Sequence, residues 1–235
     1  MSRKIKTDVK DIELSDENST ATLIFCHGLG DNATSWLYMA KELRKNLKYF
    51  RVILTNAPIS NVSVNKGLVS PSWFDILEIP VKNSSPENGI GIDESIKNIH
   101  KLIESELQKG IPANRIFLGG FSQGATLSLI SGLRYNLNQL GGIIMLSGWA
   151  HKNLKLIDYK NSKIPILICH GDKDKVVLYE NATELKSNLD KYNFQNSTLK
   201  TYSGMGHNNS TKEIGDLFDW LENITNTDNL NSKFV

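Results

Sequence analysis

Residues 115–130 read Arg115-Ile-Phe-Leu-Gly-Gly-Phe-Ser-Gln-Gly-Ala-Thr-Leu-Ser-Leu-Ile130. The apolar run 116–118 predicts a buried strand, and the run that begins at Ala125 predicts a helix. Between them, Gly120-x-Ser122-x-Gly124 fits the Gly-x-Ser-x-Gly pattern of a serine held at a sharp turn from strand to helix. Such a turn pushes the serine hydroxyl clear of the sheet, and its neighbours must be small because strand and helix nearly touch there.

Two interpretations of this turn compete. In the first it is a glycine-rich connection with an incidental serine, and in the second Ser122 is a nucleophile. The second is favoured because the strand before the serine and the helix after it are the context that the pattern requires. The N-terminus of the predicted helix also favours negative charge on a bound oxygen. A catalytic role then requires a base and an acid further along the chain.

Strand-like and helix-like segments alternate along almost the whole chain. The apolar strand candidates are residues 22–26, 50–54, 116–118, 142–146, 164–169 and 198–202. This alternation predicts one α/β domain over residues 1–235, with a mostly parallel sheet and helices on both faces. We expect residues 1–20 to form an edge strand or an arm, and residues 224–235 to form a loose tail.

Residues 58–80 form a long connection for such a fold, where a few residues usually join strand to helix. The segment carries many large apolar side chains, among them Leu68, Trp73, Ile76 and Leu77. A loop that only covers one end of the core is one interpretation. Because so many apolar groups need burial, we favour a lid or binding loop.

The composition excludes several classes of protein. The chain has 27 Lys and Arg residues against 25 Asp and Glu residues, which argues against a nucleic-acid binder. Cys26 and Cys169 lie in apolar strand-like runs and indicate buried thiols in a reducing compartment. No apolar core follows the basic N-terminus, and no apolar run reaches transmembrane length. We therefore expect a cytoplasmic protein.

A serine hydroxyl needs a base to take its proton, and the chain has five histidines. In enzymes built on this turn the order along the chain is Ser, then Asp or Glu, then His. Only His151, His170 and His207 follow Ser122, and only His207 lies beyond the last predicted strand. The sequence therefore predicts His207 as the general base and acid.

The acid is expected in the loop after the predicted strand 164–169, where Asp172 and Asp174 both qualify. Asp172 directly follows Gly171, so it could instead orient the turn through its own backbone. Asp174 reaches further into the loop and is favoured. Its role would be to hold the imidazole tautomer and to stabilise the imidazolium.

Acyl transfer also needs N–H donors aimed at the oxyanion that develops in the transition state. The residue after the nucleophile, Gln123, supplies one backbone donor. The second is expected from the turn His27-Gly28-Leu29-Gly30, at the N–H of Leu29.

A metal site is the other interpretation of the polar groups at the strand ends. Its ligands would be drawn from His27, Asp31, His170, Asp172 and Asp174. That interpretation leaves the turn at Ser122 unexplained. We therefore predict neither a metal nor a cofactor.

Taken in order, these pieces resemble the acyl-protein thioesterases, which belong to the lysophospholipase and carboxylesterase group of small α/β-hydrolases. The matching pieces run from the first predicted strand almost to the end of the chain. They are Phe25-Cys26-His27-Gly28-Leu29-Gly30-Asp31, Asn56-Ala57-Pro58, Pro71-Ser72-Trp73-Phe74-Asp75, Asn114-Arg115-Ile116-Phe117-Leu118-Gly119-Gly120-Phe121-Ser122-Gln123-Gly124, Cys169-His170-Gly171-Asp172-x-Asp174 and Tyr202-x-Gly204-Met205-x-His207. The resemblance implies an α/β-hydrolase fold with a triad of Ser122, Asp174 and His207 and oxyanion donors at Leu29 and Gln123.

The chain departs from the family at three points. Relatives usually have a proline after the triad aspartate and a valine-proline pair soon after, whereas this chain has Lys175-Val176-Val177-Leu178. Gly148-Trp149 stands where relatives often have Cys-Trp. The N-terminal cysteine through which some eukaryotic members are anchored does not occur here.

The resemblance implies hydrolysis of palmitoyl thioesters on protein cysteines through an acyl-serine intermediate. We expect S-acylated proteins and lipophilic esters as substrates; transient contact with a membrane surface and a weak homodimer stay open. The alternatives are a carboxylesterase or lysophospholipase, and a hydrolase-like protein that binds acyl groups without catalysis. The predicted acyl-binding side chains are Leu68, Trp73, Ile76, Leu77, Trp149 and Val176.

Overall fold

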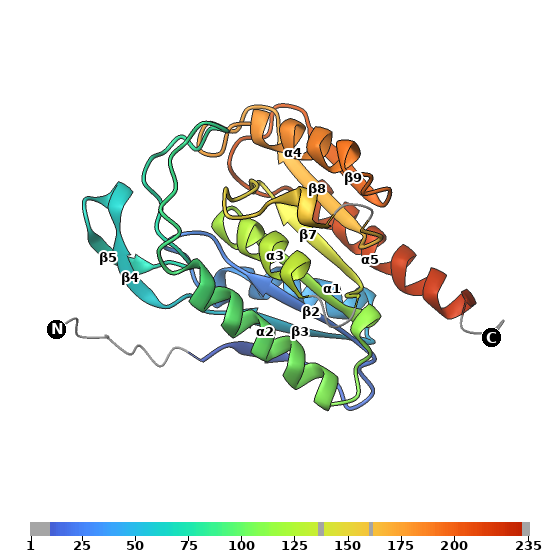
Figure 1. The fold of residues 1–235 in the computed structure, drawn as a ribbon. Helices are drawn as coiled ribbons and strands as arrows, with labels where there is room; N and C mark the ends of the chain where they lie inside the picture. The colour runs from blue at the N-terminus through green and yellow to red at the C-terminus, as the bar shows by residue number, and fades with distance from the viewer. Residues whose placement is uncertain (1–9, 136–138, 160–161, 232–235) are drawn as a thin grey trace.

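A seven-stranded, mostly parallel sheet organises the molecule (Figure 1). The computed structural model describes residues 10–135, 139–159 and 162–231, with side chains as far as residue 226. The strand order is β1-β3-β2-β6-β7-β8-β9, and only β1 runs antiparallel to its neighbour. The strands are β1 (Ile12–Leu14), β2 (Ala21–Cys26), β3 (Phe50–Thr55), β6 (Ile116–Phe121), β7 (Gly142–Leu146), β8 (Ile166–Gly171) and β9 (Ser197–Tyr202). The predicted sheet is confirmed.

Helices cover both faces of the sheet, as the alternating pattern predicts. On one face lie α2 (Ile92–Gln108), α3 (Gln123–Arg134) and α4 (Glu180–Lys191), and on the other lie α1 (Leu37–Asn46) and α5 (Thr211–Asn231). Each helix buries an apolar stripe against one of two core clusters, so the sheet separates two cores. Short 3₁₀ turns span Ala33–Trp36, Ser63–Asn65, Ala113–Arg115 and Leu156–Tyr159.

The segment 58–80 is a β-hairpin followed by a buried stretch, where the sequence predicted a loop. Strands β4 (Ile59–Val62) and β5 (Leu68–Pro71) pair antiparallel as a separate two-stranded sheet. Figure 1 shows this hairpin standing out from the main sheet. At its tip Leu68 and Val69 are exposed, whereas residues 72–76 are buried. The apolar groups thus divide between an exposed tip and a buried base.

The C-terminal helix is longer than the sequence suggested. A loose tail was predicted from residue 224, but α5 continues to Asn231. Thr225 explains part of the difference, because its buried hydroxyl contacts the hydroxyl of Tyr49 at 2.8 Å and the Leu221 carbonyl at 2.8 Å. Ile224 packs against the same core. The tail prediction is therefore wrong as far as residue 231, and residues 232–235 lie outside the described part, as do residues 1–9 of the predicted arm.

Helix α5 buries the carboxyl group of Glu213 in its first turn. Among the described residues, neither oxygen of this carboxyl has a hydrogen-bond partner. Burial raises its pKa to about 8; the backbone N–H of Ser210 offsets part of that rise, and the nearby carboxylate of Asp216 adds to it. A folded-state pKa above the unfolded value means that the folded protein binds the extra proton, so stability falls as the pH rises toward 8.

We therefore expect Glu213→Gln to remove part of the pH dependence of stability. For the wild type, the free energy of unfolding should fall by about 1–3 kcal/mol between about pH 5 and pH 8.5, because an unpaired charge must then be buried. The neutral amide should lose that decline. Urea unfolding of both proteins at the two pH values measures the effect. Equal declines in the two proteins would contradict it.

In the described part of the chain, no helix has the length and apolar character needed to cross a membrane.

Candidate active site

Ser122 occupies a strained turn between β6 and α3. Its backbone has φ 54° and ψ −119°. Residues other than glycine rarely adopt a positive φ. The Ser122 N–H donates to the carbonyl of Leu146 on the neighbouring strand β7 at 2.8 Å, which holds the turn.

The small residues around the turn are required by close backbone contacts. A Cβ at Gly120 would lie 2.4 Å from the carbonyl carbon of Gly124, and a Cβ at Gly124 would lie 2.1 Å from the carbonyl oxygen of Cys26. Both distances are far inside van der Waals contact. The Gly-x-Ser-x-Gly pattern therefore reflects how closely α3 approaches β2 and β6.

Three side chains from distant parts of the sequence meet at the carboxyl ends of the strands. His207 Nε2 lies 3.0 Å from Ser122 Oγ, and His207 Nδ1 lies 2.7 Å from Oδ2 of Asp174. Asp174 follows β8, and His207 lies in the loop between β9 and α5. The ring of Phe121 packs against the imidazole at 4.8 Å between centroids. This geometry lets the imidazole accept the Ser122 proton while the carboxylate fixes its tautomer.

The carboxylate of Asp174 is buried among hydrogen-bond donors. Its Oδ1 accepts the N–H groups of Val176 at 2.8 Å and Val177 at 2.9 Å. Its Oδ2, which receives His207, also lies 3.3 Å from Nε2 of His170. Burial alone would raise the pKa of Asp174, but hydrogen bonds from His170, His207 and the Val176 N–H hold that pKa well below its usual range. The group therefore stays ionised beside the imidazole.

The structure distinguishes the two candidate acids. Oδ1 of Asp172 accepts the N–H of Gly204 at 2.8 Å, so this carboxylate braces the loop that carries His207. It is Asp174 whose oxygen lies within hydrogen-bond distance of the imidazole. This bond reaches the loop after β9, whereas the sequence left open a role for Asp172 within its own turn.

The other four histidines lie away from the Ser122 hydroxyl and have structural partners. His170 Nε2 donates to the carbonyl of Val177 at 2.8 Å, which closes the turn behind Asp174. His27 accepts the N–H of Ala57 through Nε2 at 3.1 Å, and His100 Nε2 contacts the carbonyl of Ser131 at 2.9 Å. His151 accepts the N–H of Asn153 at 3.1 Å.

The two predicted oxyanion donors lie in different segments of the chain. Gln123 is the first residue of α3, and Leu29 lies in the turn after β2. In the described part of the chain, neither of their backbone N–H groups donates to a backbone carbonyl. Both are therefore free to donate to a substrate oxygen, as an oxyanion hole requires.

The predicted acyl-binding residues do not form one surface. Ile76, Leu77 and Trp149 line the same small cavity of about 10 Å³, whose other lining residues are Phe74, Asp75, Glu78, Val81, Ser85, Pro86 and Glu87. The Val176 side chain is half-buried beside Asp174. Leu68 is 70% exposed at the hairpin tip, and Trp73 is buried with its indole N–H bonded to the carbonyl of His27 at 2.8 Å. The structure thus keeps part of the predicted set together and places Leu68 outside it.

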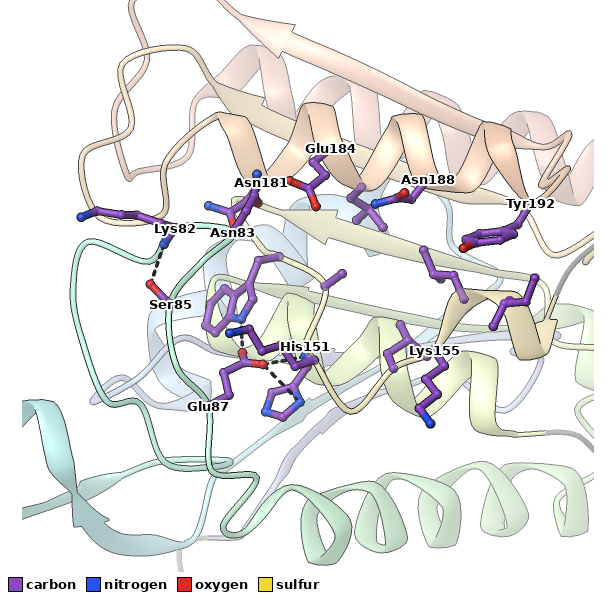
Figure 2. A pocket seen from close by; sticks show the side chains of 17 residues that line it. Lys82, Asn83, Ser85, Glu87, His151, Lys155, Asn181, Glu184, Asn188 and Tyr192 are labelled. Atoms are coloured by element: carbon purple, nitrogen blue, oxygen red, sulfur yellow. Dashed lines mark hydrogen bonds and ion pairs between the residues drawn. The ribbon is translucent and has the colours of Figure 1, made fainter.

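A second, more polar cavity adjoins this one and shares Trp149 (Figure 2). Glu87 lies on its wall and accepts the indole N–H of Trp149 at 2.7 Å and the N–H of Lys152 at 2.5 Å. Asn181, Glu184 and Asn188 of α4 line the opposite side in Figure 2. Glu87 could not be predicted from the sequence, because a lone carboxylate in an irregular segment carries no local signal.

Ligands for a metal ion do not gather anywhere in the described residues. No group of three or more His, Cys, Asp or Glu side chains is placed there to hold one. His27 and His170, two of the candidate ligands, have the backbone partners described above.

Comparison with known proteins agrees with the fold. The sequence model of the family described as Phospholipase/Carboxylesterase matches residues 7–225. A protein named acyl-protein thioesterase 1 from Yarrowia lipolytica is 37% identical over 209 residues, which cover 86% of this chain and 91% of that protein. Acyl-protein thioesterase 1 homolog 1 from Dictyostelium discoideum is 38% identical over 217 residues, covering 89% and 94%.

Solved structures agree as well. The crystal structure of Zea mays acyl-protein thioesterase 2 superimposes with a TM-score of 0.81 at 29% identity, covering 92% of this chain and 98% of that one. Arabidopsis thaliana SOBER1 gives 0.80 at 31% identity, covering 87% and 99%. With a family match over nearly the whole length and an α/β-hydrolase architecture around Ser122, the chain belongs to the phospholipase/carboxylesterase family of α/β-hydrolases.

Proposed function

We propose that the protein is a serine hydrolase that removes long-chain acyl groups, such as palmitoyl, from cysteine thioesters on proteins. The observation that carries the proposal is the hydrogen-bonded chain Ser122–His207–Asp174 in a protein whose relatives are named acyl-protein thioesterases.

The reaction follows from the geometry in two steps. Ser122 Oγ attacks the thioester carbonyl carbon while His207 Nε2 takes the hydroxyl proton. The carbonyl oxygen becomes an oxyanion that the N–H groups of Leu29 and Gln123 stabilise. The C–S bond then breaks, and the cysteine thiolate leaves readily because its conjugate acid has a pKa of about 8.5; the proton held by His207 passes to the departing sulfur, which restores the neutral imidazole. Water, deprotonated by His207, hydrolyses the acyl-serine and releases the fatty acid.

Intact-mass measurement tests this proposal directly. On mixing with a palmitoylated cysteine peptide, the protein should transiently gain the mass of one palmitoyl group at Ser122, and the peptide should lose it. A fluorophosphonate probe should label the same serine. A protein that is never labelled and leaves the peptide intact would instead be a non-catalytic acyl binder.

Carboxylesterase or lysophospholipase activity is the second candidate, because the family description and the proton-donating position of His207 suit oxygen esters as well. An alkoxide leaving group depends more on His207 as a proton donor than a thiolate does. Rates on matched acyl thioesters and oxygen esters of increasing chain length separate the two activities. Faster turnover of lysophospholipids than of acyl peptides would favour the second.

An acyl-binding site at Leu77 predicts how the rate depends on the length of the substrate's acyl chain. Leu77→Asp should lower kcat/KM for palmitoyl substrates by about tenfold or more, because a carboxylate would have to be buried beside the acyl chain. Acetyl esters, which carry no long acyl chain to contact residue 77, should be hydrolysed at nearly the wild-type rate. Ile90→Asp at an exposed isoleucine is the matched control and should leave both rates unchanged. Equal losses on the short and long substrates would contradict an acyl site at Leu77.

A further inference from the structure

The two predicted oxyanion donors come from separate segments, yet one buried stretch of chain touches both segments. This stretch is Pro71–Phe74, which begins at the last residue of strand β5 of the hairpin; we name it the strap. Its interior residues Ser72, Trp73 and Phe74 are at most 3% exposed. The Ser122–His207–Asp174 arrangement alone gives these three residues no role in the reaction.

One side of the strap is bonded to the turn that carries Leu29. The N–H of Gly30 donates to the carbonyl of Pro71 at 2.8 Å. The indole N–H of Trp73 donates to the carbonyl of His27 at 2.8 Å, and the two rings lie 5.2 Å apart. The residues immediately before and after the Gly28–Leu29 pair are thus both tied to the strap.

The other side of the strap is bonded to the side chain of Gln123. The amide oxygen of Gln123 accepts the N–H of Trp73 at 3.1 Å. Its Nε2 donates to the hydroxyl of Ser72 at 2.9 Å and to the carbonyl of Phe74 at 2.6 Å. The same residue therefore offers its backbone N–H to the site and its side chain to the strap.

Burial gives these contacts their strength. Gln123 is fully buried, and His27 and Trp73 are nearly so. In such surroundings a hydrogen bond is stronger than in water, and a group left without its partner is costly, so each bond strongly favours one geometry. An oxyanion hole needs this rigidity, since its donors act only when they are already in place.

We propose that Trp73 and the side chain of Gln123 are positioning residues that, through the strap, fix the distance between the Leu29 and Gln123 N–H groups. The inference rests on the proposed function, because it assumes that these two N–H groups bind the oxyanion. It gives Trp73 a different task from the acyl-binding one predicted from the sequence. It also links the hairpin to the oxyanion hole, because the strap continues from the hairpin and is hydrogen-bonded to both donor segments.

The test uses Trp73→Phe, which keeps a ring and removes the indole N–H, and Gln123→Met, which removes the amide. Each should lower kcat by about 10- to 100-fold with KM within about twofold, because misplaced donors weaken transition-state binding more than substrate binding. Trp220→Phe, on α5 outside the site, is the matched control and should keep the wild-type kcat. Circular dichroism and thermal unfolding establish that each variant is folded at the assay temperature.

Inhibition by a trifluoromethyl ketone gives a second measurement. Its inhibition constant would not change if Trp73 and the Gln123 side chain only stabilised the fold. Ser122 Oγ adds to its carbonyl, the hydroxyl proton passes to His207, and the product carries an oxyanion in the hole. The inhibition constant should rise in both variants by the same factor as kcat/KM falls. Because both side chains act through one strap, the double variant should lose less than the product of the two single losses.

The outcomes separate the two proposals. A wild type that neither reacts with the fluorophosphonate nor hydrolyses acyl esters overturns the proposed function. An active wild type with Trp73→Phe and Gln123→Met variants that match it in kcat and in ketone affinity overturns the role of the strap. If Gln123→Met is unfolded, Trp73→Phe alone decides between these results.

Discussion

Ser122→Gly is expected to abolish hydrolysis and at the same time to stabilise the folded protein. Without the hydroxyl no acyl-serine can form, and kcat should fall by about 10⁵- to 10⁶-fold, as it does when the nucleophile of a triad is removed. The fold, however, holds Ser122 at φ 54°, where a side chain costs about 1–3 kcal/mol. Glycine adopts this conformation freely, so the strain disappears with the activity.

Ser122→Ala separates the two effects. Alanine also lacks the hydroxyl, but it keeps the Cβ and therefore the backbone strain. We expect both variants to be inactive and the glycine variant to be more stable than the alanine variant by about 1 kcal/mol, since the greater freedom of glycine in the unfolded chain offsets part of the gain. Urea unfolding of the two variants measures this difference. An alanine variant as stable as the glycine variant would show that the turn stores no strain.

Local patterns in the sequence were sufficient to predict the sheet and the three residues that meet at its edge. The nucleophile turn is visible because close contacts leave only glycine at positions 120 and 124. His207 was found by its place after the last strand, and parallel strands bring all such loops to one edge. Asp174 was favoured over Asp172 by its place further along the loop, and the family resemblance strengthened that choice; in the structure it is Asp174, of the two, that reaches the imidazole.

What the sequence did not reveal depends on side-chain contacts between distant segments. The amide of Gln123 bonds to residues about fifty positions earlier in the chain, and no periodicity encodes such a pairing. Leu68 and Trp73 were both assigned to the acyl site because they are large and apolar. The hairpin exposes Leu68 and buries Trp73 in a hydrogen bond, and composition alone cannot separate these outcomes.

Asp174→Asn should have the second largest effect, because it changes which nitrogen of His207 carries the proton. The amide oxygen can still accept the N–H groups of Val176 and Val177, which directs its NH₂ group toward His207 Nδ1. An NH₂ group can only donate, so the imidazole must present a bare Nδ1 and carry its proton on Nε2. That tautomer cannot take the Ser122 proton. We expect kcat to fall by about 10⁴-fold.

The same substitution should change how stability depends on pH. Because the folded-state pKa of Asp174 is held below its usual value, its carboxylate adds stability that is fully present above the unfolded pKa of about 4 and is lost as the pH falls toward the folded value. The uncharged amide cannot show this loss. The free energy of unfolding of Asp174→Asn should therefore fall less steeply below about pH 4 than that of the wild type.

Asp172→Asn is the matched control, since the same chemical change two residues away has a different expected result. The amide oxygen at position 172 can still accept the N–H of Gly204, so the loop that carries His207 keeps its brace. We expect this variant to hydrolyse substrate within a few-fold of the wild-type rate. Steady-state kinetics of the two asparagine variants, together with their acid unfolding curves, make the comparison. If Asp172→Asn loses as much activity as Asp174→Asn, the result contradicts the assignment of Asp174 as the carboxylate that orients His207.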